Sequence, residues 1–370
     1  MFHKAAKSGK YCAFRAQCSL VWGVSPVREI GKGYNMSIKD NIDPGFRGIV
    51  YVERDEEVLC ESITGFADIA NGIPNTISTR FETASAGKAF VAAGILQLIE
   101  QGRLRFDSTL GELFDIDLHD IDPEVTVRQL LTHTSGVPDY FDESVMDEYE
   151  ELWRDIPNYR IRRNDDLFAL FIDKPMMYPR GERFQYNNSG YVLLASVIER
   201  VTGTPFDEYL AKNVFEPCGM SSTGYFPLDR LPAGCANSYI LCPETGGFRT
   251  NIYSIEANGS GAGGAFVTVP DILLFWKGLL GGKLLSADTV SQMMSRQSGD
   301  GSDPVEGYYG YGLWIIDAPA GRDIAYFHGC DPGAGFLSEY DPNTGTISVL
   351  VSNYCDNVWA EMRKIRKAIY

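Results

Sequence analysis

The chain has 370 residues, of which 44% are hydrophobic, so it can bury one large core or two closely packed ones and is not globally disordered. Its 33 Lys and Arg residues against 49 Asp and Glu residues give a formal net charge of −16, which argues against nucleic acid or an anionic membrane surface as a partner. No stretch approaches 18 consecutive apolar residues, so the sequence predicts no membrane span.

Eight cysteines and four histidines are spread along the chain, and no two cysteines form a CxxC pair. Structural zinc sites and disulfide-rich scaffolds depend on such clustered ligands. The sequence therefore predicts reduced, mostly buried thiols and no metal or cofactor.

The chain begins with Lys4, Lys7 and Lys10 followed by an apolar patch at 11–24, which is a weak form of the signal-peptide pattern. Polar residues interrupt this patch, and no convincing small-residue cleavage site follows it. We therefore expect residues 1–35 to be an N-terminal extension, with Met36 as a possible functional start. A cytoplasmic protein is predicted, with export as the alternative.

The first regular elements are a strand pair and a buried helix. β-Branched and apolar residues at 48–53 and 58–66, separated by a charged turn, predict an N-terminal hairpin. Residues 85–101 form a helical pattern that is apolar nearly all round and ends at Gly102. Such a helix belongs in the interior of a protein.

Helical signals dominate the middle of the chain, and strand signals return near its end. Helices are predicted at about 189–203, 268–281 and 358–369, and strands at 311–316, 324–328, 336–340 and 346–352. The fold class is therefore α/β of the α+β type, with one antiparallel sheet built from both termini and flanked by helices. Residues 36–110 and 262–370 would form the sheet region, and 111–261 a mostly helical insertion.

Ser85 and Lys88 form the strongest chemical signal. A serine at a helix start and a lysine three residues later lie on one helix face, about 5–6 Å apart at Cβ. Because the helix is buried, the amine loses solvation, its pKa falls, and it can act as a base toward the serine hydroxyl.

Tyr186 and Asn188 form the second signal, in a loop that leads into the 189–203 helix. Two residues apart, they can project from one loop toward one site. A tyrosine near an ammonium can transfer protons, and an asparagine amide can hold a substrate carbonyl. A core tyrosine and a helix-capping asparagine are the structural alternative.

Three ordered motifs carry a resemblance to a known family: Ser85-x-x-Lys88, the Leu-Leu-Thr-His-Thr-Ser-Gly segment at 130–136, and Tyr186-x-Asn188. Together they resemble the serine β-lactamase and penicillin-binding protein superfamily, most closely its class C-like branch. That branch also contains DD-peptidases, D-aminopeptidases and esterases. The resemblance runs from about residue 48 to the C-terminus and implies the β-lactamase/transpeptidase-like fold.

The family's third motif, Lys or His followed by Thr and Gly on an inner strand, maps onto this chain in two registers. Without gaps, Phe327 takes the Lys or His position, His328 the Thr position and Gly329 the motif glycine. Cys330 then supplies a backbone oxyanion donor beside that of Ser85. The other register, in which His328 is the motif cation, differs by one residue and exchanges the faces of the strand.

We favour the ungapped register, in which Phe327 cannot bind a substrate carboxylate and the sequence leans away from an efficient β-lactamase. His328 could partly compensate if it faces the cleft. For Cys330, a small buried residue is preferred over a reactive thiol. His133, in the second motif, is expected to have a scaffold role, and the acidic stretch 142–155 to be a solvated face or a cleft rim.

The resemblance implies an acyl-enzyme on Ser85, with Lys88 as its base, Tyr186 as proton donor to the leaving group and Asn188 as a substrate-orienting residue. The predicted function is therefore a serine hydrolase that cleaves an amide or ester in a small molecule or short peptide. Esterase, D-amino-acid peptidase or amidase, and weak β-lactamase stay open as activities. The alternative is a penicillin-binding or peptide-recognition protein with slow or no turnover.

Overall fold

The computed structural model describes residues 38–299, 301, 307–318 and 321–369. The expected extension at 1–35 and the start at Met36 lie outside these residues, so both stay predictions, as does the cytoplasmic location. In the described part of the chain, no helix has the length and apolar character needed to cross a membrane.

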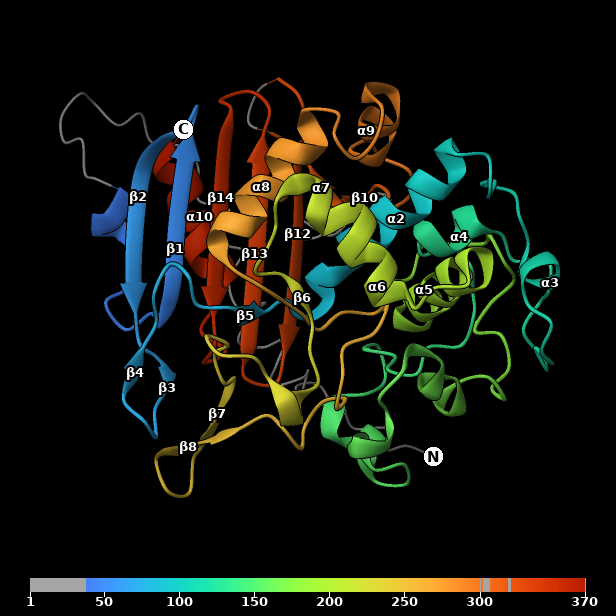
Figure 1. Ribbon diagram of the computed structural model, residues 1–370, viewed down its shortest axis with the longest axis horizontal. Helices are drawn as coiled ribbons and strands as arrows, with labels where there is room; N and C mark the ends of the chain where they lie inside the picture. Colours follow the sequence, from blue (N-terminus) through green and yellow to red (C-terminus); the bar gives the residue numbers. More distant parts are fainter. Residues whose placement is uncertain (1–37, 300, 302–306, 319–320, 370) are drawn as a thin grey trace, which may run out of the picture.

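A seven-stranded antiparallel sheet contains strands from both ends of the chain (Figure 1). In the order β10-β11-β12-β13-β14-β1-β2, its strands are β10 (Tyr308–Tyr309), β11 (Trp314–Ile316), β12 (Ile324–Asp331), β13 (Ala334–Asp341), β14 (Thr346–Ser352), β1 (Gly48–Arg54) and β2 (Glu57–Thr64). The two ends of the chain meet where β1 pairs with β14, with Ile49 opposite Val351. The predicted antiparallel sheet built from both termini is confirmed.

The β1–β2 hairpin turns over two residues in the left-handed region, Asp55 at φ 48° and Glu56 at φ 68°. Two consecutive residues with positive φ are the mark of a type I′ turn, whose twist matches that of the flanking strands. The tight turn fixes the register of the first two strands.

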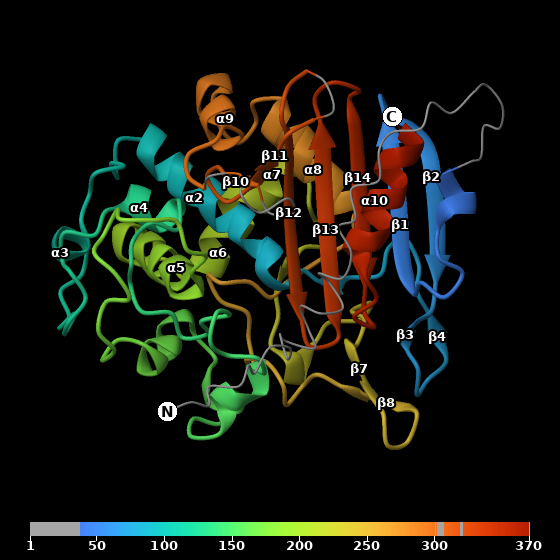
Figure 2. The same cartoon turned by 180° about the vertical axis from the view of Figure 1, so that it is seen from behind.

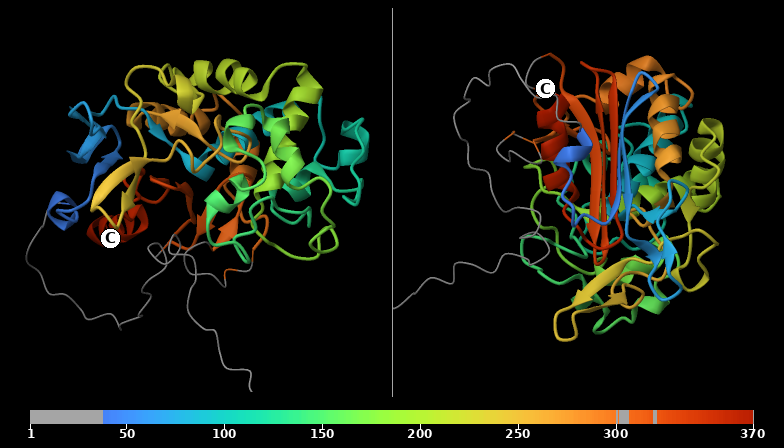
Figure 3. Two further views of the ribbon diagram at one scale, coloured as in Figure 1. Left: turned by 90° about the horizontal axis from the view of Figure 1, so that it is seen from below. Right: turned by 90° about the vertical axis from the view of Figure 1, so that its left-hand side faces the viewer.

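Helices cover both faces of the sheet. α8 (Val269–Leu280) lies on one face and α10 (Val358–Ile369) on the other, as the front and back views show (Figures 1 and 2). The edge-on view shows the same layers, with the sheet between them (Figure 3). The helical spacing of apolar residues in α10 is the predicted one, and the structure packs this helix against β13 and β14.

α2 (Lys88–Glu100) is the buried helix that the sequence predicts. It follows a 3₁₀ turn, η2 (Ala84–Gly87), and Gly102 just beyond its end has φ 69°. Its Phe90 ring meets the edges of Phe215 and Phe275, with ring centres 5.2 and 5.0 Å away. Aromatic packing on several sides fixes the helix, and with it the turn that begins at Ala84.

The remaining α-helices and short strands complete the described fold. They are β3 (Phe66–Asp68), β4 (Ile73–Pro74), β5 (Phe81–Glu82), α3 (Leu110–Leu113), α4 (Val127–Leu131), α5 (Asn188–Thr202), α6 (Phe206–Leu210), α7 (Glu216–Cys218), β6 (Gly224–Tyr225), β7 (Tyr239–Cys242), β8 (Gly247–Thr250), β9 (Ala265–Val267) and α9 (Ala287–Met293). The 111–261 segment thus holds helices and loops, together with three short strands. Its division from the sheet region as a separate unit stays a prediction.

Candidate active site

Ser85 lies in the η2 turn, which is held in a tight backbone arrangement. Ala84 has φ 48°, an uncommon value for a residue with a Cβ, and its carbonyl accepts a 3.1 Å hydrogen bond from the Gly264 amide. A Cβ at Gly263 would stand 2.3 Å from the same carbonyl, so only glycine allows this approach. The 259–264 loop therefore fixes the backbone that carries Ser85.

Lys88 stands directly behind Ser85, and its ammonium group has three oxygen partners. Nζ is 3.0 Å from Ser85 Oγ, 2.9 Å from Asn188 Oδ1 and 2.5 Å from the Ala262 carbonyl oxygen. The amide and carbonyl oxygens can only accept hydrogen bonds, so they take two of the amine's hydrogens. The third tetrahedral position of the nitrogen faces the serine hydroxyl.

Burial lowers the pKa of Lys88 to about 8. The side chain is 1% exposed, and desolvation disfavours its charged form more than the nearby carboxylates, Asp139 first among them, favour it. A neutral amine is therefore available near neutral pH. Its lone pair can then accept the Ser85 proton.

Asn188 is positioned by Asp139, a buried residue that the sequence analysis did not single out. The Asp139 carboxylate accepts the backbone N–H of Asn188 at 2.9 Å and that of Ser189 at 3.1 Å, at the start of α5. It also accepts the Asn188 side-chain amide at 3.3 Å, which turns Oδ1 toward Lys88. The amide of Asn188 thus serves Lys88 within the protein, and its expected contact with substrate stays a prediction.

Tyr186 lines the pocket beside Lys88, with Nζ 5.0 Å from the centre of its ring. The ring stacks on Trp314, 5.8 Å between centres. His133 lies on another side, 4.5 Å from it, and its Nδ1 accepts the Asn187 backbone N–H at 3.1 Å. Burial holds the pKa of His133 well below its usual value, so this neutral ring acts as packing for the Tyr186 loop.

β12 passes so close to the η2 turn that Gly329 has no room for a side chain. A Cβ there would be 2.3 Å from the Thr83 carbonyl oxygen and 2.5 Å from the Ser85 nitrogen. The strand and the turn therefore meet backbone to backbone. Cys330 follows Gly329 and lines the pocket, where its amide is the proposed second oxyanion donor beside that of Ser85.

The ungapped register places Phe327 among the substrate-binding residues of the cleft, and the structure corrects this expectation. The Phe327 side chain is 1% exposed and packs in the core against Phe90 of α2 and Phe275 and Trp276 of α8, on the face of β12 that these two helices cover. Neighbouring residues of a strand point to opposite faces, so it is His328 that lines the pocket.

His328 stacks on Trp314 with ring centres 5.6 Å apart, and Trp359 of α10 meets its edge at 5.1 Å. The third-motif strand thus presents a histidine within an aromatic wall to the pocket.

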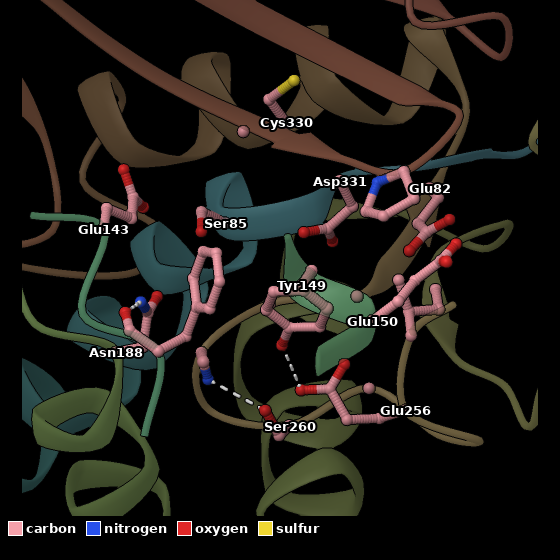
Figure 4. A pocket seen from close by; sticks show the side chains of 18 of the residues that line it. Glu82, Ser85, Glu143, Tyr149, Glu150, Asn188, Glu256, Ser260, Cys330 and Asp331 are labelled. Carbon is pink, nitrogen blue, oxygen red and sulfur yellow. Dashed lines mark hydrogen bonds between the residues drawn. The ribbon is translucent and has the colours of Figure 1, made fainter. Parts of the chain in front are cut away.

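Figure 4 shows the pocket, a cavity of about 320 Å³ that contains Ser85. The rim includes Glu143, Asp147, Glu148 and Glu150, so the acidic stretch 142–155 forms a cleft rim, one of the two interpretations of the sequence. Further carboxylates, which the sequence analysis missed, come from Glu82 in β5, Glu256 in a loop and Asp331 at the end of β12. Glu82 and Asp331 adjoin recognised motifs, but Glu256 has no local signal.

Comparison with known proteins decides the family. The family model described as Beta-lactamase matches residues 38–367. The chain belongs to the beta-lactamase family. It is a serine hydrolase of the β-lactamase and penicillin-binding protein type, as the sequence motifs predict.

Relatives with this fold include penicillin-binding proteins and an amidase. The chain is 26% identical over 326 residues to the PbpX protein of Bacillus subtilis (strain 168), covering 88% of this chain and 75% of that protein. The crystal structure of a penicillin binding protein from Bacillus halodurans has 38% identity and a TM-score of 0.83, covering 90% of this chain and 98% of that one. D-amino acid amidase from Ochrobactrum anthropi SV3 shares the fold at 22% identity, with a TM-score of 0.74 and coverage of 90% and 98%.

Proposed function

We propose that this chain hydrolyses an amide or ester through an acyl-enzyme on Ser85. The observation that carries the proposal is the geometry of Lys88, whose Nζ lies 3.0 Å from Ser85 Oγ while two fixed oxygens occupy its other hydrogens. Ser85 Oγ attacks the substrate carbonyl as its proton passes to Lys88. The Ser85 and Cys330 amides then stabilise the oxyanion.

Tyr186 completes the proton path. When the tetrahedral intermediate collapses, the bond to the leaving nitrogen or oxygen breaks and that atom takes a proton from the Tyr186 hydroxyl, which Lys88 replaces. The support is the position of the ring, next to Lys88 and on the pocket wall. Water then attacks the acyl-enzyme by the reverse proton path and releases the acid.

The substrate is proposed to lack the carboxylate that β-lactams and D-Ala-D-Ala peptides carry. Because Phe327 is buried in the core, the pocket face of the third-motif strand carries His328 and no lysine, and the described lining residues include seven carboxylates. An anionic group would meet repulsion there. An amidase or esterase of this family, similar in fold to the D-amino acid amidase, therefore fits the site better than a β-lactamase.

The test combines labelling and turnover. The wild type should bind a fluorophosphonate covalently and hydrolyse p-nitrophenyl isobutyrate. Ser85→Ala should lose the label and at least about 10³-fold in kcat/KM, because no other group replaces the nucleophile. Ser144→Ala, a change of an exposed serine outside the catalytic set, is the matched control. A Ser85→Ala variant with full activity would contradict the mechanism.

The second candidate is a penicillin-binding protein with slow turnover, favoured by the 38% identity to the Bacillus halodurans protein. It predicts a stable acyl adduct on Ser85 with a penicillin, seen by intact mass, and a burst without steady turnover of the ester. Sustained ester turnover without a penicillin adduct would support the hydrolase instead.

A further inference from the structure

One end of the pocket concentrates negative charge. Seven carboxylates line the cavity, whereas Arg249 is the one lysine or arginine among its described lining residues. Arg249 forms a 2.6 Å ion pair with Glu150, so its charge is already engaged at the rim. The charge of Lys88 lowers the pKa of Glu256 and Asp331, but by less than burial raises it. Figure 4 shows Glu82, Glu256 and Asp331 at the side of the pocket away from Asn188.

These three residues, here called the inner carboxylates, are held by different elements. Glu82 accepts hydrogen bonds from Ser238 and Asn251, both at 3.0 Å. Glu256 accepts one from Tyr149 at 2.6 Å, drawn in Figure 4.

Asp331 differs from the other two, since its carboxylate has no hydrogen-bond or ion-pair partner in the described part of the chain. It ends β12, where it pairs with Ala334 across a tight turn and its side chain is aimed into the cavity. A partner from outside the chain could therefore reach it.

Grouping the inner carboxylates is electrostatically unfavourable. Burial raises the pKa of each of them, that of Glu82 to about 7, and repulsion by neighbouring carboxylates adds to the rise for Glu82 and Asp331. A cation bound among them would remove this penalty. In the described part of the chain, no three His, Cys, Asp or Glu side chains are arranged to hold a metal ion. The space that the inner carboxylates line therefore suits an organic cation.

The direction of β12 decides which part of a substrate meets them. The proposed oxyanion donor is Cys330, and Asp331 is the next residue. His328 lies two residues earlier, about 7 Å along the strand, beside Trp314, which also contacts Tyr186. Because Tyr186 protonates the leaving group, the leaving group points toward His328, and the acyl group points toward Asp331.

We propose that the inner carboxylates, with Asp331 as the primary contact, bind a protonated amine on the acyl part of the substrate. The substrate class is then an amide or ester of an amino acid, or of a peptide with a free amino end. This inference rests on the proposed function and adds its specificity.

The test compares substrates that differ only in charge. Alanine p-nitroanilide, in each enantiomer, carries the ammonium group, and isobutyryl p-nitroanilide replaces it with a methyl group of similar size. The neutral ester p-nitrophenyl isobutyrate reports hydrolysis independently. The wild type should prefer the better alanine enantiomer over the isobutyryl anilide by at least about tenfold in kcat/KM, as for a charge-assisted hydrogen bond.

Asp331→Asn should reduce this preference by about 10- to 100-fold, and Glu256→Gln, which keeps the acceptor for Tyr149, should reduce it in the same direction. Asp120→Asn removes one exposed negative charge outside the pocket and should leave the preference unchanged. Fluorophosphonate labelling of Ser85 verifies that each variant has a formed site.

Equal rates on the two anilides, or a preference that survives in Asp331→Asn, would overturn this inference while ester hydrolysis upholds the proposed function. A wild type that neither labels nor hydrolyses any substrate would overturn both.

Discussion

Lys88 is a buried amine whose state of protonation should control the rate. Burial lowers its pKa to about 8, from about 10.4 for a free lysine, and only the neutral form can accept the Ser85 proton. The neutral fraction grows as pH rises, so kcat/KM for p-nitrophenyl isobutyrate should increase with pH and level off above about 8. This substrate does not titrate, so the profile reports the enzyme.

Asp139→Asn tests whether the pH dependence of kcat/KM reports the protonation of Lys88. The Asp139 carboxylate raises the pKa of Lys88, followed by smaller contributions from Asp331, Glu143 and Glu256. Removing its charge should therefore move the inflection to lower pH. Asp120→Asn is the control and should leave it in place. An inflection near 10 in the wild type, or one that Asp139→Asn does not move, would contradict the role of Lys88 as the base.

Phe327 gives the second prediction at this scale. Its ring is enclosed by Phe90, Phe275, Trp276 and Phe336, so Phe327→Lys would bury an ammonium group without a partner. The expected loss in the free energy of unfolding exceeds about 4 kcal/mol, and the variant should be largely unfolded in a thermal melt. His328→Lys, on the pocket face of the same strand, should stay folded. A stable Phe327→Lys variant that binds carboxylate substrates would restore the original interpretation of the motif.

At the level of elements, the contact between β12 and the η2 turn is the point on which the oxyanion site depends. Gly329→Ala would place a methyl group 2.5 Å from the Ser85 nitrogen, so the strand or the turn must move. We expect a loss of about 10²–10³ in kcat, the usual cost of one oxyanion donor, with a smaller change in melting temperature.

Gly335→Ala on β13 is the matched control for that change, because its Cβ would meet a first neighbour at 3.3 Å and its backbone φ is ordinary. It should keep most of the activity. If Gly329→Ala keeps kcat while Gly335→Ala loses it, then the proposed contact has no catalytic role.

The sequence predicts those elements whose own pattern determines them. The predicted bounds of α10 are the observed ones, and those of α2 and α5 differ by a few residues, because apolar spacing and terminal residues are local signals. β10 and the pair β5–β9 have only two or three residues each, too few for any periodicity. These short strands form because the tertiary structure places the edge of another strand beside them, with which they can pair.

The site divides in the same way. Ser85, Lys88, Tyr186 and Asn188 lie in local motifs, and the structure brings them together. Asp139 and Glu256 reach the site from distant loops, and such meetings depend on the packed tertiary structure. The motif alone also does not determine which side chains of β12 face the pocket, because a one-residue change of register would move Phe327 from the core to the pocket.

At the scale of the whole molecule, the net charge of −16 and the acidic pocket rim create a field that attracts cations. Such attraction acts over a Debye length, which shrinks from about 20 Å or more at low salt to a few ångströms near 1 M. Raising NaCl from about 0.02 to about 0.5 M should therefore lower kcat/KM for alanine p-nitroanilide by roughly two- to fivefold, because encounter with the cation slows.

The neutral ester is the internal control, since its kcat/KM should not change over the same range of salt. Asp331→Asn separates the long-range field from the local contact. Its kcat/KM for the anilide should be lower at every salt concentration, but the relative decrease with salt should remain close to that of the wild type, because the other acidic residues still supply the field. A parallel decrease in kcat/KM for the ester would show that salt acts on the protein itself. If kcat/KM for alanine p-nitroanilide does not change with salt, the net charge of the protein does not accelerate the encounter with this substrate.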